Sequence, residues 1–197
     1  ESGLILSIGR WVINESCRQA SLWHKAGYEN FTIAINLSPK QFLDKDIVPF
    51  IENCLHTHSL AGNQVEIEVT EGLFIEGGEA INLQISAMKE LGLSLALDDF
   101  GTGYSSLQYL RNYPFDTLKI DRSFVSGLPE SQSDASLVRA MTAMGRALGM
   151  KIVAEGVEQQ AQADYLKNEG CDIYQGFLFG KPMSETDFMA WLKNVHL

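Results

Sequence analysis

Six short apolar runs in this 197-residue sequence each end in an acid, an amide or a lysine. The polar residues at these six ends are Asn36, Glu68, Glu71, Asp98, Asp99, Lys119, Asp121, Glu155 and Gln175. Carboxylate and carbonyl oxygens suit hard cations such as Mg²⁺ or Mn²⁺ rather than zinc. Two hard cations sharing carboxylates promote in-line displacement at phosphorus, and adjacent Asp98 and Asp99 suit such sharing. We therefore interpret these residues as a two-metal phosphoryl-transfer site.

Each of these residues has an ordinary structural interpretation when it is taken alone. Glu68 fits the solvent face of an alternating strand, and a lysine at a strand end is usually a solvated charge. The combination across six ends favours function, because chance polarity would not supply one such side chain at every end. The four histidines, His24, His56, His58 and His196, lie away from these ends, and we interpret them as ordinary surface or core residues.

The composition excludes several other classes of protein. There are 25 acidic against 15 basic residues, a net charge of −10, which argues against binding polymeric nucleic acid. A small phosphate ligand stays compatible, because a metal ion inverts the local sign of charge. With no apolar run of about 18 residues, we expect no membrane contact by this segment. Three dispersed cysteines predict reduced thiols and a cytoplasmic location, although the parent protein could still be membrane-anchored.

The elements that position these residues alternate between strands and helices. Apolar runs predict strands at residues 31–36, 65–70, 93–98, 117–120, 151–154 and 171–174. Helical periodicity predicts helices at 4–26, 39–55, 81–91, 137–148 and 159–169, a short helix after Gly101-Thr-Gly103, and a last helix from 184 to 195. The dipeptide Ser38-Pro39 predicts an N-cap and first helical residue, and Ser184 with Asp187 predicts a capping box.

Strict strand–helix alternation indicates an α/β fold with a parallel sheet, either doubly wound or closed as a (β/α)₈ TIM-type barrel. No GxGxxG fingerprint follows a strand, which favours the barrel. Eight repeats typically need about 250 residues. We therefore expect one domain over residues 1–197, a barrel with its first strand portion missing from this chain.

Six motifs in this order resemble the EAL-domain cyclic di-GMP phosphodiesterases. They are Asn36-Leu-Ser38, Glu68-Val-Thr-Glu71, Asp98-Asp-Phe-Gly-Thr-Gly-Tyr-Ser-Ser106, Lys119-Ile-Asp121, Ala154-Glu-Gly-Val-Glu158 and Gln175-Gly176. The resemblance implies a (β/α)₈ barrel that hydrolyses cyclic di-GMP to linear pGpG with two Mg²⁺ or Mn²⁺ ions. It also implies a homodimer, and a parent protein that carries GGDEF or sensory domains.

The resemblance assigns roles to individual residues. Asn36, Glu68 and Asp98 would bind one metal ion, and Asp98, Asp99 and Glu155 the other. Lys119 and Glu155 would be catalytic, with Lys119 positioning the attacking water. Gln175, Glu158 and Gly156 would face the substrate, and Glu71 would anchor the loop Asp99–Ser106. The Glu-Ala-Leu triplet that names the family is absent from this sequence, so we expect the strand that carries it, with a further metal ligand, upstream of Glu1.

Three questions stay open at the level of sequence. The proton acceptor is one, since a lysine can act as a base only if its pKa is strongly lowered. A catalytically inactive cyclic di-GMP receptor is the main alternative function, although a receptor needs no complete metal set. An unrelated barrel enzyme such as an aldolase is a weaker alternative, with Gly176 and Gly180 a poor match to its phosphate-binding loop.

Overall fold

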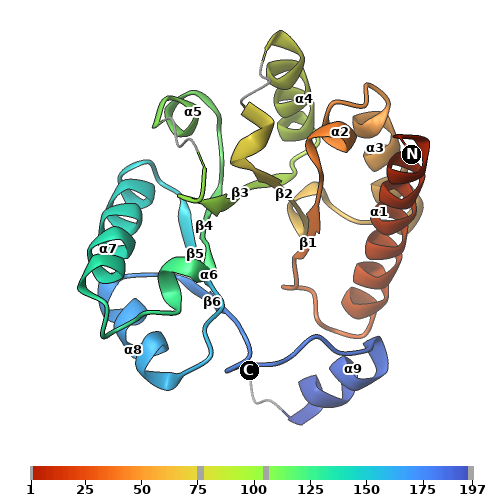
Figure 1. Cartoon of the computed structure of the whole chain (residues 1–197). Helices are drawn as coiled ribbons and strands as arrows, with labels where there is room; N and C mark the ends of the chain where they lie inside the picture. Colours follow the sequence, from red (N-terminus) through yellow and green to blue (C-terminus); the bar gives the residue numbers. More distant parts are fainter. Residues whose placement is uncertain (1, 75–77, 104–106, 195–197) are drawn as a thin grey trace.

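A computed structural model describes residues 2–74, 78–103 and 107–194. Figure 1 shows strands curling around the middle of the molecule, with helices on the outside. The strands are β1 (Ile33–Asn36), β2 (Val65–Thr70), β3 (Ser94–Phe100), β4 (Thr117–Ile120), β5 (Lys151–Glu155) and β6 (Ile173–Gln175). The α-helices are α1 (Ser2–Lys25), α2 (Pro39–Phe42), α3 (Ile47–His58), α4 (Glu79–Glu90), α5 (Leu107–Asn112), α6 (Arg122–Val125), α7 (Gln132–Ala147), α8 (Gln160–Glu169) and α9 (Glu185–Asn194). Two 3₁₀ turns are η1 (Gly62–Gln64) and η2 (Glu71–Phe74).

The described strands form one parallel sheet in chain order, from β1 to β6. A doubly wound sheet would reverse its strand order at a switch point. Sequential order with the helices outside is instead the winding of a (β/α)₈ barrel, so the TIM-type prediction is confirmed. The sheet is a curled arc between β1 and β6 (Figure 1). On the side where the arc is open, between β1 and β6, Phe188 of α9 packs on Trp23 of α1, with ring centroids 5.1 Å apart.

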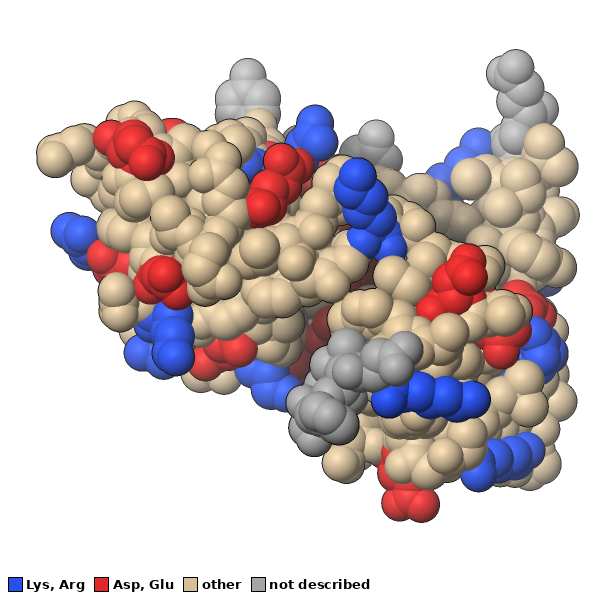
Figure 2. Space-filling model, turned by 90° about the horizontal axis from the view of Figure 1, so that it is seen from below, with Lys and Arg blue, Asp and Glu red and all other residues tan. Residues whose placement is uncertain are grey.

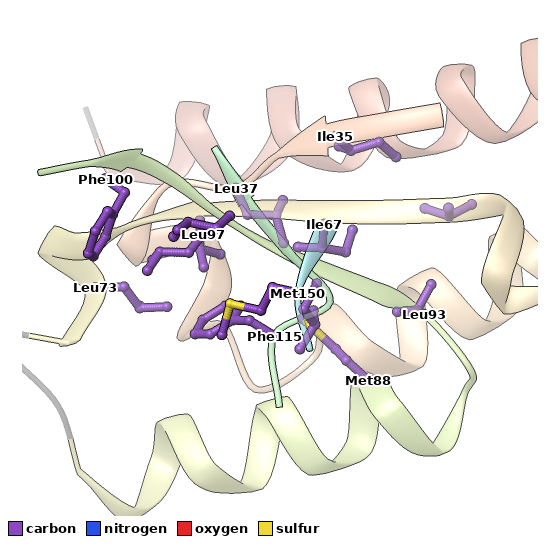
Figure 3. Packing of buried hydrophobic residues seen from close by; sticks show 14 of the residues in the cluster. Ile35, Leu37, Ile67, Leu73, Met88, Leu93, Leu97, Phe100, Phe115 and Met150 are labelled. Carbon is purple, nitrogen blue, oxygen red and sulfur yellow. The ribbon is translucent and has the colours of Figure 1, made fainter. Parts of the chain in front are cut away.

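Alternation along the strands separates an apolar outer face from a polar inner face. In β2, Val65, Ile67 and Val69 are buried in the main hydrophobic core with residues of the surrounding helices. Glu66 and Glu68 alternate with them and therefore lie on the inner face. Figure 3 shows part of the outer core, where Met88 of α4 lies near Leu93 and Met150. The inside of the arc is thus left free for polar chemistry.

Most predicted elements are present, the cap at Ser38 is confirmed, and of the predicted Ser184–Asp187 capping box the hydrogen bond to the Ser184 hydroxyl is present. Ser38 caps α2 with Pro39 in its first turn, and Ser184 Oγ accepts the N–H of Asp187 at 3.2 Å. The single helix predicted over 39–55 is wrong, because α2 ends at Phe42 and α3 begins at Ile47. Asp44 lies in the break, where its carboxylate accepts the N–H of Asp46 at 3.2 Å and pairs with Arg10 at 2.9 Å. Such side-chain acceptors compete with helical hydrogen bonds.

Other boundaries shift by a few residues. The helix predicted at 137–148 begins earlier, at Gln132, because Ser131 caps it before its apolar periodicity starts. The short helix predicted after Gly103 begins at Leu107, and residues 104–106 lie outside the described part of the chain. The predicted end of the last helix at Val195 also lies outside the described residues. Strand β3 continues two residues past its predicted end at Asp98.

The outer surface carries mixed charge. On the face shown in Figure 2, Lys and Arg lie interspersed with Asp and Glu, and the surface is hollowed between two parts of the molecule. Among the described residues, none of the helices has the length and apolar character needed to cross a lipid bilayer.

Candidate metal and phosphodiester site

The ammonium of Lys119 lies where three strands deliver acids to the inside of the arc. Its Nζ is 2.8 Å from Glu68 Oε1 of β2, 3.0 Å from Asp98 Oδ1 of β3 and 2.8 Å from Glu155 Oε1 of β5. Lys119 is only 3% exposed, while Glu68 and Asp98 are 6% and 8% exposed. Residues predicted at separate strand ends are therefore brought together in one buried cluster.

The acids and the lysine perturb one another. Burial alone lowers the pKa of Lys119, but hydrogen bonds to Glu155 and Glu68 outweigh it, so this pKa lies above its ordinary value. Burial raises the pKa of Glu155 against the opposing effect of Lys119, with Asp98 and Glu68 raising it further. A protonated lysine cannot accept a proton. In this arrangement Lys119 neutralises and orients the carboxylates.

A distortion of β3 turns two successive aspartates toward the same site. Neighbouring side chains on a regular strand point to opposite faces. Here the β3–β4 register shifts between Leu97 and Phe100, and Asp99 adopts a left-handed φ of +54°. The N–H of Asp99 donates to Asp98 Oδ1 at 3.0 Å. Carboxylate oxygens of Asp98, Asp99 and Glu155 thereby lie within 4.8 Å of one another. A bulge with strained backbone is typical of functional sites.

The chemistry of this donor set fits a hard divalent cation. The clustered groups are carboxylates, and an amide oxygen is available from Asn36 beside them. Burial, followed by the charges of Asp98 and Asp121, raises the pKa of Asp99, and Lys119 opposes this increase. Among the described residues, three of the four clustered carboxylates form ion pairs with the ammonium of Lys119, and the fourth, Asp99, lies beside Asp98 and Glu155. The cluster therefore has excess negative charge that bound cations would neutralise.

The amide of Asn36 lies on the β1 side of the cluster. Its Nδ2 donates to Glu68 Oε2 at 2.8 Å, and Asn36 and Glu68 are register partners on β1 and β2. Because Nδ2 is engaged with Glu68, the amide oxygen is left as the group that could bind a metal.

The residues predicted to face the substrate lie around the β5 and β6 ends. Gln175 is the register partner of Glu155 and lines a cavity of about 760 Å³ between α1, β6 and α9. Glu158 is exposed on the loop after β5. Position 156 requires a glycine for a structural reason, because its φ is +69° and an added Cβ would collide with the Cβ of Arg122.

The carboxylate of Glu71 contacts the segment that follows Asp99. Its Oε1 accepts the N–H of Gly101 at 2.9 Å, and a Cβ added to Gly103 would lie 3.1 Å from its Oε2. Glu71 is buried, at 7% exposed. It therefore holds the start of the loop predicted to depend on it, whereas Tyr104 to Ser106 lie outside the described residues.

Two polar residues differ from the sequence-based interpretation. Asp121 forms no ion pair with Lys119 among the described residues; its carboxylate caps α6 by accepting the N–H of Ser123 at 3.0 Å, and its charge acts on neighbouring Asp99. Sequence reasoning also passed over Glu66, which lies on the inner face of β2 and accepts a hydrogen bond from Thr117 Oγ1 at 2.7 Å. Its position two residues before Glu68 in an alternating strand is the signal that would have found it.

Three comparisons connect this geometry to known proteins. The chain is 43% identical over 190 residues to MucR of Pseudomonas aeruginosa, a bifunctional diguanylate cyclase/cyclic di-GMP phosphodiesterase, covering 96% of this chain and 28% of that protein. A solved MucR phosphodiesterase in complex with c-di-GMP has a TM-score of 0.90 at 44% identity, covering 94% of this chain and 75% of that one. The BlrP1 structure of Klebsiella pneumoniae with manganese and cyclic di-GMP has a TM-score of 0.79 at 31% identity, covering 88% and 45%.

The chain spans less than a third of the length of the curated relatives it matches. The EAL domain model matches residues 1–182, which is most of the sequence and contains all the clustered acids. This chain therefore belongs to the EAL domain family.

Proposed function

We propose that this chain hydrolyses cyclic di-GMP to linear pGpG as the phosphodiesterase part of a longer signalling protein. The observation that carries the proposal is the buried cluster in which Lys119 joins Glu68, Asp98 and Glu155. Three relatives support the proposal, because MucR, PdeR of Escherichia coli and NbdA are named as cyclic di-GMP phosphodiesterases.

Two divalent cations, Mg²⁺ or Mn²⁺, are proposed to bind this cluster. Asn36, Glu68 and Asp98 would hold one ion, and Asp98, Asp99 and Glu155 the other. Asp98 suits the shared position because its carboxylate lies both against Lys119 and among the oxygens of Asp99 and Glu155. Such cations supply Lewis acidity, which polarises phosphate oxygens and makes water more acidic.

The chain's own residues then orient the reaction. In the structure, three carboxylates occupy the three N–H donors of Lys119. Once cations bind those carboxylates, Lys119 would be free to donate a hydrogen bond to the attacking water and hold it in line with the bond to the leaving oxygen. The water oxygen bonds to phosphorus and the water gives up one proton, while the bond from phosphorus to the 3′ oxygen breaks and that oxygen takes up one proton. Cleaving one of the two phosphodiester bonds of the ring leaves a linear dinucleotide with a 5′ phosphate.

Further residues complete the proposal. Gln175, Glu158 and Gly156 would line the substrate side, and Glu71 would couple the loop after Asp99 to metal binding. A homodimer and GGDEF or sensory domains in the parent protein are proposed from the family resemblance, and a cytoplasmic location is proposed from the three dispersed cysteines. We also propose that an upstream Glu-Ala-Leu strand joins residues 1–197 in the complete domain, supplying one more ligand.

The test is to incubate the purified chain with cyclic di-GMP and Mn²⁺ or Mg²⁺ and to follow pGpG by chromatography. The same assay runs on a longer natural version that includes the upstream segment. Asp98→Ala is the inactive variant, and Glu90→Gln on the exposed side of α4 is the matched control. Product from the wild type and Glu90→Gln, but not from Asp98→Ala, is the expected result.

The other outcomes assign the remaining alternatives. Product only from the longer version would show that the upstream strand is required. Binding of cyclic di-GMP without product from either version would overturn the proposal in favour of a receptor. Neither binding nor turnover would point to a different barrel enzyme.

A further inference from the structure

A second polar pair lies deeper in the arc than the acid cluster. Thr117 Oγ1 donates to Glu66 Oε2 at 2.7 Å, joining residues 51 positions apart in the chain. Thr117 is only 2% exposed, and Glu66 is partly buried. The contact is therefore a well-formed hydrogen bond in a protected place, rather than a chance surface contact.

This hydrogen bond connects two strands that are not neighbours. Glu66 is on β2 and Thr117 on β4, with β3 between them. At the crossing, β3 presents Ser94, the register partner of Glu66, and on the same face Ala96, which is fully buried and is the register partner of Thr117. A methyl group leaves room for the carboxylate and the hydroxyl to meet over β3. A larger residue at this position would separate them.

The same two strands carry the central ion pair. Side chains two residues apart on a strand share a face. Glu68 therefore follows Glu66 on the inner face of β2, as Lys119 follows Thr117 on β4. Glu68 and Lys119 are themselves 2.8 Å apart. Two parallel contacts thus span β3, one in the acid cluster and one a layer below it.

We propose that Glu66 is a positioning residue for the metal site. Its hydrogen bond with Thr117 sets the separation of β2 and β4, and so places Glu68 and Lys119 for cation binding. The inference rests on the proposed function, since it assumes that the cluster binds divalent cations.

Stability alone does not explain an acid at this position. The interior of a (β/α)₈ barrel is usually filled by branched apolar side chains, and burying a carboxylate is unfavourable. An apolar residue beside Ala96 would avoid that cost but would make no directional contact across β3. Partners that orient metal ligands commonly affect metal affinity or activity about 10- to 100-fold.

The experiment is a double-mutant cycle with Glu66→Met and Thr117→Val, which remove the hydrogen bond with little change of size. Mn²⁺ affinity is measured by calorimetry, alongside kcat, KM and thermal unfolding. Glu66→Gln and Thr117→Ser are the conservative variants, because each keeps an acceptor or a donor in place. Thr142→Val is the matched control, since it removes another buried hydroxyl, one that lies near Cys171.

We expect each disruptive variant to weaken Mn²⁺ binding about tenfold and to lower kcat more than it changes KM. The double variant should be no weaker than either single variant, because both act through one hydrogen bond. The two conservative variants should recover binding, and Thr142→Val should bind Mn²⁺ as the wild type does.

The inference is overturned if the disruptive variants lose only thermal stability and keep wild-type Mn²⁺ affinity. It is also overturned if their effects on affinity are additive. Because calorimetry needs no turnover, a wild type that binds Mn²⁺ without hydrolysing cyclic di-GMP would contradict the proposed function while the cycle still decides the inference. The cycle is carried out in the longer version that includes the upstream segment, and a wild type of that version that binds no Mn²⁺ would overturn both.

Discussion

The two ends of the sheet use acidic residues in opposite ways. At the amino end, Asp116 accepts the N–H of Leu95 at 2.7 Å and pairs with Lys89, also at 2.7 Å. Asp172 repeats this arrangement, accepting the N–H of Ile152 at 2.8 Å, with Arg146 at 3.9 Å. Each acid there precedes a strand, binds the neighbouring strand and has a cation of its own.

At the carboxyl end the acids share one cation. Glu68, Asp98 and Glu155 all contact Lys119, and Asp99 lies beside them. At the half-exposed amino end, each acid has its own cation and joins two strands. At the carboxyl end, the buried acids outnumber their cation and therefore repel one another. We infer that the amino end contributes stability and that the carboxyl end carries the proposed cation site, a division common to (β/α)₈ barrels. Substitutions at the two ends should therefore separate activity from stability.

The largest effect is expected for Asp98→Ala. Removing the shared carboxylate should lower turnover about 10³-fold or more, because metal-ion stabilisation supplies several kcal/mol in the transition state. Thermal stability without added metal should change little, since the variant loses one pairing with Lys119 but also relieves repulsion from Asp99 and Glu155. Steady-state kinetics and thermal unfolding measure the two quantities. Turnover within tenfold of wild type would contradict the two-metal proposal.

Lys119→Ala should give the next largest effect. Turnover should fall about 100-fold, and affinity for cyclic di-GMP should fall less, since the ammonium is proposed to position the attacking water. Without metal, the variant should lose about 3 kcal/mol of stability, because three buried carboxylates lose their common partner. Added Mn²⁺ should then raise its unfolding temperature more than that of the wild type. Equal losses in kcat and in nucleotide affinity would argue that Lys119 binds substrate instead.

The sequence predicted some features of the two ends of the sheet and not others. The apolar runs with polar ends predicted the strands and placed their acids at one edge of the sheet. This was possible because side chains alternate between the two faces of a strand. The left-handed backbone of Asp99 left no signal, since an aspartate pair reads the same in a regular strand. Nor could sequence place Lys119 within 3.0 Å of acids on three strands, because that depends on the curvature of the sheet. The break at Asp44 was hidden by apolar residues on both sides.

Asp116→Ala should reduce stability without reducing activity. The N–H of Leu95 would lose its acceptor and Lys89 its partner, and the free energy of unfolding should fall by about 1–3 kcal/mol. Urea unfolding measures this loss. Turnover per folded molecule should stay near the wild-type value, since the change lies at the opposite end of β3 and β4 from the cluster. A large fall in kcat with unchanged stability would contradict the division between the two ends.

The smallest effect is expected for Asp172→Ala, which tests how much of the rim interaction comes from charge. Its carboxylate also accepts a backbone N–H, but its cation is more distant than that of Asp116, and Arg146 is more exposed than Lys89. Exposed ion pairs contribute about 0–1 kcal/mol, so the stability loss should be smaller than for Asp116→Ala by about that amount. Raising the salt concentration should bring the two variants closer together, because screening weakens the Lys89 pair. Equal losses at low salt would show that the backbone hydrogen bond carries the whole effect at both positions.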